Sequence, residues 1–194
     1  MTTELLLIRH AETELAGAFC GQLDPPLNPR GRQQAVELVK SLAAETIQAV
    51  YSSDLQRAFD VGTALAESKG LSCRSAPALR EIYFGAWEGL AWKKIETRDP
   101  EIAAAWLARF PRLSAPGGES FHAFEQRVLA EITSICSQRE VSIAIVTHAG
   151  VIRLLLQRLA RLNEEQTWER PLPFCSVLRL SRADDSDVWG LIHE

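Results

Sequence analysis

Two short segments of the chain are almost continuously apolar. They cover residues 5–8 (LLLI) and 143–146 (IAIV), and residues 47–53 form a third, less uniform segment. Short, uniform runs of this kind are typical of strands that are buried on both faces, as in a parallel sheet. A helical pattern follows each of the three segments, so strands and helices alternate. This alternation predicts an α/β fold with helices on both faces of the sheet.

The clearest helical pattern begins at Asn28. Asn28 is a suitable N-cap and Pro29 takes the first helical position. Apolar residues then recur at the spacing of one helix face, at Ala35, Leu38, Val39 and Leu42. The segment therefore predicts a helix that packs one face against the sheet.

Two further helices are expected after the other apolar segments. Asp54 is a candidate N-cap for the first, whose apolar face consists of Leu55, Ala58, Phe59, Gly62 and Leu65. The second begins near Gly150 and is apolar on nearly all sides, which predicts a buried helix.

Two other regions interrupt this alternation. Residues 87–118 are irregularly helical, contain Trp87, Trp92 and Trp106, and lead into the sequence PGGES. We interpret them as a helical lid inserted over one end of the sheet. Residues 176–194 contain two strand-like pieces around an Asp/Ser turn, which predicts a C-terminal hairpin at the sheet edge. The expected fold is a three-layer α/β/α sandwich with a mostly parallel sheet, formed by a single domain over residues 1–194.

Composition and charge exclude several classes of partner. The 194 residues carry a formal net charge of −4, so the molecule has no general basic field for nucleic acid or an anionic membrane. Arginines interrupt the leucine-rich residues 151–162, which argues against a membrane span. Four cysteines without CxxC spacing, and no signal-like start, predict reduced thiols and a cytoplasmic location. A homodimer is left open.

Polar residues that could carry chemistry follow the predicted strands. Arg9 and His10 end the first, Arg57 lies in the first turn of the helix after residues 47–53, and His148 follows residues 143–146. Glu81 lies in a predicted loop. Taken singly, each has an ordinary structural explanation. Together they fall where ligands bind in open α/β sheets, beyond the carboxyl ends of the strands.

The histidines strengthen this interpretation. Of the four in the chain, two end the most strand-like segments, whereas His122 and His193 are expected on a helix face and at the C-terminus, without a role. Two histidines beside two arginines make a poor metal site, because guanidinium groups repel a dication. The same set suits a phosphoryl group, since arginines bind its oxygens and a neutral imidazole can attack phosphorus. Nearby positive charge should lower the pKa of His10 and keep it unprotonated.

Five motifs together resemble the histidine phosphatase (phosphoglycerate-mutase-like) superfamily: RHAET, GQLDPPLNPRGRQQA, SSDLQRAFDVGTALA, LREIYFGAWEG and VTHAG. Their order and spacing agree across essentially the whole chain. The resemblance implies that His10 is transiently phosphorylated, that Arg9, Arg57 and His148 hold the phosphoryl oxygens, and that Glu81 protonates the leaving oxygen. It also implies that no metal or other cofactor is needed and that the substrate is a small phosphate ester. Further residues expected at the phosphate are Cys20, Gly21, Gln22 and Ala149.

Some positions depart from the family pattern. Ala11 and Ala149 stand where glycines are common, and Ala16 and Cys20 replace polar residues. Ala11 and Ala149 require backbone angles that alanine can adopt. Ala16 and Cys20 remove polar contacts near the phosphate, which bears on the reaction rate and on substrate fit.

The motif details FGAWEG and PGGESFHAFEQRV are most similar to the α-ribazole phosphatases of cobalamin biosynthesis. This implies α-ribazole 5′-phosphate or adenosylcobalamin 5′-phosphate as substrate, with the lid tryptophans either stacking on the benzimidazole ring or packing the lid. Three alternatives remain. They are a broad-specificity or sugar (bis)phosphate phosphatase, a phosphoglycerate mutase, and a non-catalytic domain that binds a phosphorylated ligand. The short insertion after the acid motif favours hydrolysis over the mutase.

Overall fold

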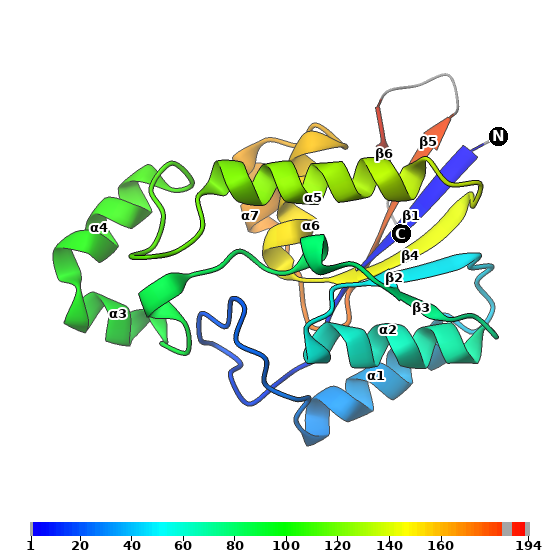
Figure 1. The fold of residues 1–194 in the computed structure, drawn as a ribbon, viewed down its shortest axis with the longest axis horizontal. Helices are drawn as coiled ribbons and strands as arrows, with labels where there is room; N and C mark the ends of the chain where they lie inside the picture. The colour runs from blue at the N-terminus through cyan, green and yellow to red at the C-terminus, as the bar shows by residue number, and fades with distance from the viewer. Residues whose placement is uncertain (1, 184–187, 193–194) are drawn as a thin grey trace.

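A mixed β-sheet forms the centre of the computed structural model, which describes residues 2–183 and 188–192 (Figure 1). Its strands are β1 (Thr2–Arg9), β2 (Ala49–Ser52), β3 (Cys73–Ser75), β4 (Ser142–Thr147), β5 (Val177–Ala183) and β6 (Gly190–Ile192). They lie in the order β3-β2-β4-β1-β5-β6. The first four are parallel, β5 is antiparallel to β1, and β6 is antiparallel to β5. The mostly parallel sheet is as the sequence predicts.

Helices cover both faces of this sheet. On one face lie α1 (Pro29–Ser41) and α2 (Gln56–Ser68), and on the other lie α5 (Phe121–Cys136), α6 (Ala149–Arg158) and the short α7 (Glu164–Glu169) (Figure 1). Successive side chains of β1 alternate between the two layers: Leu5 and Leu7 pack with α5 and α6, whereas Leu6 and Ile8 pack with α1 and α2. Burial on both sides explains the unbroken apolar run, since each such side chain contributes about 1.5–3 kcal/mol.

The two helix starts predicted from capping residues turn out differently. The Asn28 side chain accepts a hydrogen bond from the Gly31 amide at 2.7 Å, as predicted for α1. The prediction that Asp54 caps α2 is wrong. Both Asp54 carboxylate oxygens pair with Arg80, at 2.7 and 2.5 Å, while Asp24 accepts from the first α2 amide, that of Gln56, at 2.6 Å. A bidentate guanidinium partner outcompetes a neutral backbone amide.

Residues 87–118 form the expected helical insertion. It contains α3 (Trp92–Arg98) and α4 (Pro100–Arg109), which lie beyond the carboxyl ends of the parallel strands (Figure 1). A separate apolar cluster that includes Trp87, Ile95 and Trp106 holds the insertion together. At its base, the Glu119 amide donates to the Tyr83 carbonyl at 2.8 Å. We call residues 87–118 the lid.

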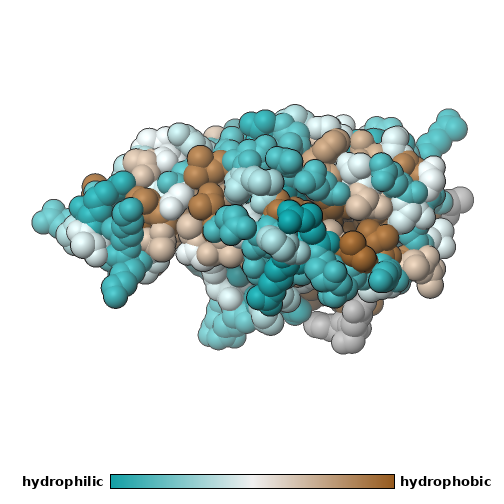
Figure 2. All heavy atoms as spheres, turned by 90° about the horizontal axis from the view of Figure 1, so that it is seen from below, coloured by the Kyte–Doolittle hydropathy of each residue, from teal (hydrophilic) through white to brown (hydrophobic). Residues whose placement is uncertain are grey.

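Near the C-terminus, β5 and β6 pair as the predicted edge hairpin. The Asp/Ser turn expected between them, residues 184–187, and His193 lie outside the described residues. Hydrophilic side chains predominate on the face shown in Figure 2, with apolar ones in smaller patches. Among the described helices, none has the length and apolar character needed to cross a membrane. The four cysteines are all unpaired.

Candidate active site

His10 is positioned directly by the end of β1. Its amide donates to the Thr147 carbonyl of the neighbouring strand at 2.9 Å. The ring Nδ1 lies 2.7 Å from the Ala11 carbonyl, an acceptor only, so Nδ1 carries the proton and Nε2 has a free lone pair. Burial and the positive charges of Arg57 and Arg9 lower the pKa of His10 to about 3, although the bond to Ala11 opposes this shift. His10 is therefore a neutral imidazole with Nε2 available as a nucleophile.

Arg57 and Arg9 supply positive charge beside His10. Arg57 is 1% exposed, and its two terminal nitrogens donate to the carbonyls of Leu23 at 2.6 Å and Gly21 at 2.7 Å. Arg9 donates to the Leu172 carbonyl, and its guanidinium lies 4.1 Å from the centre of the Phe174 ring. In both arginines Nε is buried without a partner in the described part of the chain. The site thus holds two oriented cations beside His10.

His148 lies beside His10 because of the register of the sheet. Arg9 pairs with Thr147, so the next residues of the two strands meet, and the two imidazole rings are 5.1 Å apart. Nε2 of His148 lies 2.9 Å from the Ser53 hydroxyl, which follows β2. Its Nδ1 is buried without a described partner, and burial holds its pKa well below the ordinary value, with Arg57 and His10 adding to the effect.

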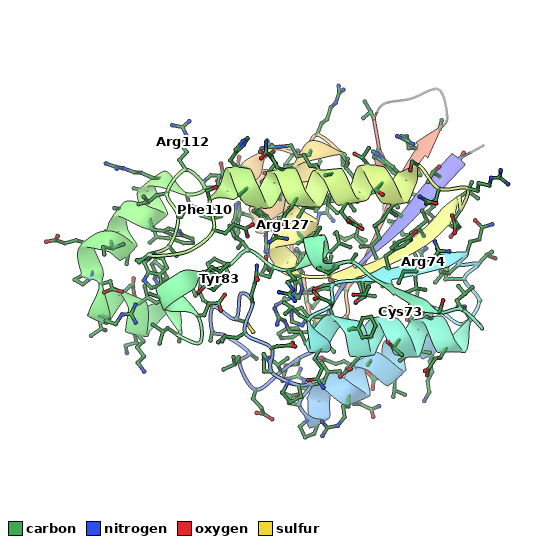
Figure 3. The ribbon with its side chains drawn as sticks, in the orientation of Figure 1. Cys73, Arg74, Tyr83, Phe110, Arg112 and Arg127 are labelled. Carbon is green, nitrogen blue, oxygen red and sulfur yellow. The ribbon has the colours of Figure 1, made fainter. Side chains whose placement is uncertain are left out.

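Glu81 reaches the same site from the loop that follows β3. One carboxylate oxygen accepts from the Gly150 amide at 3.0 Å and the other from the Ile82 amide, also at 3.0 Å. Arg127 of α5 fixes this loop, because it donates to the carbonyls of Ala78, Arg80 and Glu81 at 2.7, 2.8 and 3.0 Å (Figure 3). The carboxylate is thereby held at the N-terminus of α6.

A cavity of about 900 Å³ opens from these residues towards the lid. Its outer wall is rich in aromatic side chains, namely Phe19, Phe84, Trp92, Trp106, Phe110, Phe121, Phe124 and Trp168. Figure 3 shows Phe110 between the lid helices and α5. A polar floor with apolar walls of this size suits a phosphate ester with a large organic group. Within the described residues, no group of three or more His, Cys, Asp or Glu side chains could hold a metal ion.

Comparison with known proteins identifies the family. The family model for the histidine phosphatase superfamily (branch 1) matches residues 5–192. The chain belongs to this superfamily. A metal-independent phosphoserine phosphatase of Arabidopsis thaliana is 36% identical over 167 residues, which cover 82% of this chain and 69% of that protein. The adenosylcobalamin/α-ribazole phosphatase of Escherichia coli K12 is 33% identical over 167 residues, covering 84% and 82%.

A solved structure agrees with these relatives. The α-ribazole phosphatase of Shigella flexneri superposes with a TM-score of 0.87 at 30% identity, covering 98% of this chain and 95% of that one. Family and relatives together identify the chain as a histidine phosphatase, and its α/β/α fold is that of the family.

The alanines that replace family glycines fit this backbone. Among the described residues other than glycine, only Arg161 and Cys175 have a positive φ. Ala11 and Ala149 therefore adopt angles that are ordinary for alanine. Ala149 is the first residue of α6. Both Ala149 and Ala16 line the cavity.

Residues 20–22, which the sequence places at the phosphate, differ in their contacts. Cys20 and Gly21 line the cavity, whereas Gln22 is not among the residues that line it. Its side chain donates to the Glu81 carbonyl at 3.3 Å and its amide donates to Glu88 at 2.7 Å. Both contacts join Gln22 to residues 81–88. Its expected place at the phosphate stays a prediction, as does that of His148, which is also not among the residues that line the cavity. The Cys20 thiol lies 3.6 Å from the Leu23 carbonyl, and burial raises its pKa.

The three lid tryptophans differ in their surroundings. Trp87 is fully buried and packs inside the lid, while Trp92 and Trp106 line the cavity. His122 is exposed on α5, the helix position expected for it.

Sequence reasoning missed several residues that shape this histidine phosphatase site. Ser53 lies inside a motif that was recognised, so its position next to β2 could have indicated it. Glu88 and Arg127 also lie inside quoted motifs, but their partners are far away in the chain, as is that of Phe174, which lies in no motif.

Replacing Gly150 with alanine is expected to lower kcat about 10²-fold. A Cβ at this position would lie 2.2 Å from the Glu81 carboxylate, so the carboxylate must move, and displacement of about 1 Å can have an effect of this size. Steady-state hydrolysis of an alkyl phosphate measures it. Gly190→Ala is the matched control, because its nearest contact is 3.8 Å and its activity should equal that of wild type. Equal rates for both variants would contradict the assigned position of Glu81.

Proposed function

We propose that this phosphatase hydrolyses phosphomonoesters through a covalent phosphohistidine at His10. One observation carries the proposal: the proton of His10 is on Nδ1, bonded to Ala11, which leaves Nε2 unprotonated in a ring whose pKa the charges of Arg57 and Arg9 help to lower. In the first step Nε2 attacks phosphorus, the N–P bond forms and the bond from phosphorus to the alcohol oxygen breaks. Water then attacks the phosphohistidine and releases inorganic phosphate and free His10.

Arg9, Arg57 and His148 are proposed to hold the three phosphoryl oxygens. The positive charges of Arg57 and Arg9 beside His10, and the contact between the His148 and His10 rings, support this role. With Ser53 donating to Nε2 of His148, Nδ1–H of His148 becomes a donor for an oxygen. Such donors are already oriented before reaction, so they stabilise the charge that develops in the transition state. Cys20, Gly21 and Ala149 would border the bound phosphoryl group.

Glu81 is proposed as the proton donor to the leaving oxygen and then as the base that activates water. Its position at the mouth of the phosphoryl site supports this role. The two arginines also neutralise charge that a divalent ion would otherwise neutralise, and their repulsion disfavours such an ion. We therefore propose that the reaction needs no metal or other cofactor.

The substrate that we propose is α-ribazole 5′-phosphate or adenosylcobalamin 5′-phosphate. The aromatic wall of the cavity, which includes Trp92 and Trp106, can contact a flat base. The relative from Escherichia coli is named as a phosphatase of adenosylcobalamin and α-ribazole phosphates. The phosphoserine phosphatases among the relatives support a broader specificity as the alternative.

A substrate panel tests this proposal. Inorganic phosphate release is measured for α-ribazole 5′-phosphate, phosphoserine, a sugar phosphate and p-nitrophenyl phosphate, all in excess EDTA. We expect turnover without metal and the highest kcat/KM for α-ribazole 5′-phosphate. Dependence on added Mg²⁺ would contradict the mechanism, and the absence of turnover above a His10→Ala control would indicate a binding domain. Phosphate transfer that requires a bisphosphate primer would indicate a mutase.

We also propose a cytoplasmic enzyme formed by a single domain over residues 1–194, with the lid as an insertion. The unpaired cysteines support the location, and the pairing of β1 with β5 supports the single domain.

A further inference from the structure

The ring of Phe174 lies against two groups of the active site. The guanidinium of Arg9 is 4.1 Å from the centre of this ring, and the centre of the His10 ring is 5.5 Å away at an interplanar angle of 52°. Phe174 also lines the cavity. One side chain thus contacts both the proposed nucleophile and a residue proposed to hold the phosphoryl group.

The loop between α7 and β5 fixes the ring in this position. Its backbone is bonded to the end of β1, because the Cys175 amide donates to the Arg9 carbonyl at 3.1 Å and the Arg9 amide donates to the Ser176 carbonyl at 3.1 Å. Cys175 has a φ of 59°, in the left-handed region that residues other than glycine seldom adopt. Such a conformation persists only where the surrounding structure determines it. The place of Phe174 is therefore set by backbone contacts with the strand that carries Arg9 and leads into His10.

Two contacts from this loop orient the guanidinium of Arg9. Its Nη1 donates to the Leu172 carbonyl, and the group lies over the Phe174 ring. A guanidinium is attracted to the negative face of an aromatic ring, and more strongly where water is excluded. One bonded nitrogen and one covered face together fix the plane of the group. A guanidinium held in this way can meet phosphoryl oxygens with little further loss of side-chain freedom.

The same ring separates His10 from water. His10 is 7% exposed, and the two described rings in contact with it are the apolar Phe174 and the polar His148. The charged or titratable groups that face His10 are Arg9 of β1, Arg57 of α2 and His148 at the start of α6. Burial is the largest cause of the low pKa of His10, ahead of the charge of Arg57. An apolar side chain on this side therefore helps to keep the imidazole neutral.

We propose that Phe174 is a positioning residue of the phosphatase site, which aligns Arg9 with the phosphoryl group and excludes water from His10. The inference rests on the proposed function, because it takes Arg9 as a phosphoryl ligand. It goes beyond that function in giving the loop between α7 and β5 a part in the reaction.

Three substitutions of Phe174 separate the two effects. Phe174→Leu keeps an apolar side chain but lacks an aromatic face. It should raise the dissociation constant of inorganic phosphate about 3- to 30-fold, the range of a cation–π contact, and leave the pKa of His10 nearly unchanged. Phe174→Tyr keeps the ring and should bind phosphate within about a factor of two of wild type. Phe174→Ala removes both features, so it should weaken phosphate binding and raise the pKa of His10 from about 3 towards the ordinary 6.5.

Calorimetric titration with phosphate measures the first effect, and NMR titration of ¹⁵N-labelled histidine, assigned with His10→Ala, measures the second. In an Arg9→Met background, Phe174→Leu should leave phosphate affinity unchanged, because the ring acts through that guanidinium. Tyr51→Leu is the matched control. It removes the ring that contacts Arg74 away from the cavity, and it should bind phosphate as wild type does (Figure 3).

Several outcomes would overturn the proposal. They are an unchanged phosphate affinity in Phe174→Leu, equal losses in Phe174→Leu and Phe174→Tyr, a loss that persists in the Arg9→Met background, and a pKa of His10 that Phe174→Ala does not move. Wild-type phosphate affinity in Arg9→Met alone would contradict the proposed role of Arg9, and with it the alignment by Phe174. Neither measurement involves turnover, so a failure of the covalent mechanism would leave both results as they are.

Discussion

His10→Ala is expected to lower kcat by about 10⁴-fold or more and to leave no acid-labile phosphate on the protein. The neighbouring imidazole of His148 should not substitute for it, because its Nε2 is engaged by Ser53 and its ring centre is 5.1 Å away. Steady-state assays with p-nitrophenyl phosphate and rapid quench with a labelled ester measure the two effects.

The pH dependence and a matched variant sharpen this experiment. The folded-state pKa of His10 is about 3, below the ordinary value, so His10 becomes protonated only as the pH falls towards 3. The phosphoenzyme burst of wild type should therefore persist at pH 5. His122→Ala removes an exposed histidine of α5 and should leave both measurements at wild-type level. Product formation without labelled phosphate on wild-type protein would contradict the covalent mechanism.

The sequence predicted the fold well because the sheet is buried on both faces. The apolar side chains of residues 5–8 and 143–146 can all be buried only when the strands lie between two helical layers. Once these strands are parallel and adjacent, their carboxyl ends coincide, so residues that follow each run come together. The meeting of His10 and His148 thus needed no knowledge of loops.

What the sequence did not predict depends on contacts between distant segments. Asp54 is a reasonable N-cap in isolation, but Arg80 takes its carboxylate. Gln22 lies in a recognised motif, but its hydrogen bond to the Glu81 carbonyl joins segments that are 59 residues apart. Arg153 was noted only as a charge that interrupts an apolar helix. Its exposure to the cavity became apparent only with the position of α6.

Glu81→Gln is expected to lower kcat about 10²- to 10⁴-fold, the usual effect of removing a general acid and base. The amide keeps nearly the same shape, but it cannot donate the proton or accept one from water. With p-nitrophenyl phosphate the leaving group needs no proton, so the first step should remain fast while water attack becomes slow. The variant should therefore accumulate phosphohistidine, seen as a burst of about one p-nitrophenolate per active site. An alkyl phosphate should give no burst, because its alcohol leaves slowly without an acid.

The contrast between these two esters is what identifies the role. A loss caused by distortion of the phosphoryl site would slow both esters in the first step and would give no burst with either. Glu67→Gln, an exposed position on α2, controls for the loss of one negative charge and should behave as wild type. A Glu81→Gln enzyme within a factor of two of wild type would place the proton donor elsewhere. A burst with the aryl ester alone would assign both proton transfers to this one carboxylate, since the same group must then serve the alcohol and the water in turn.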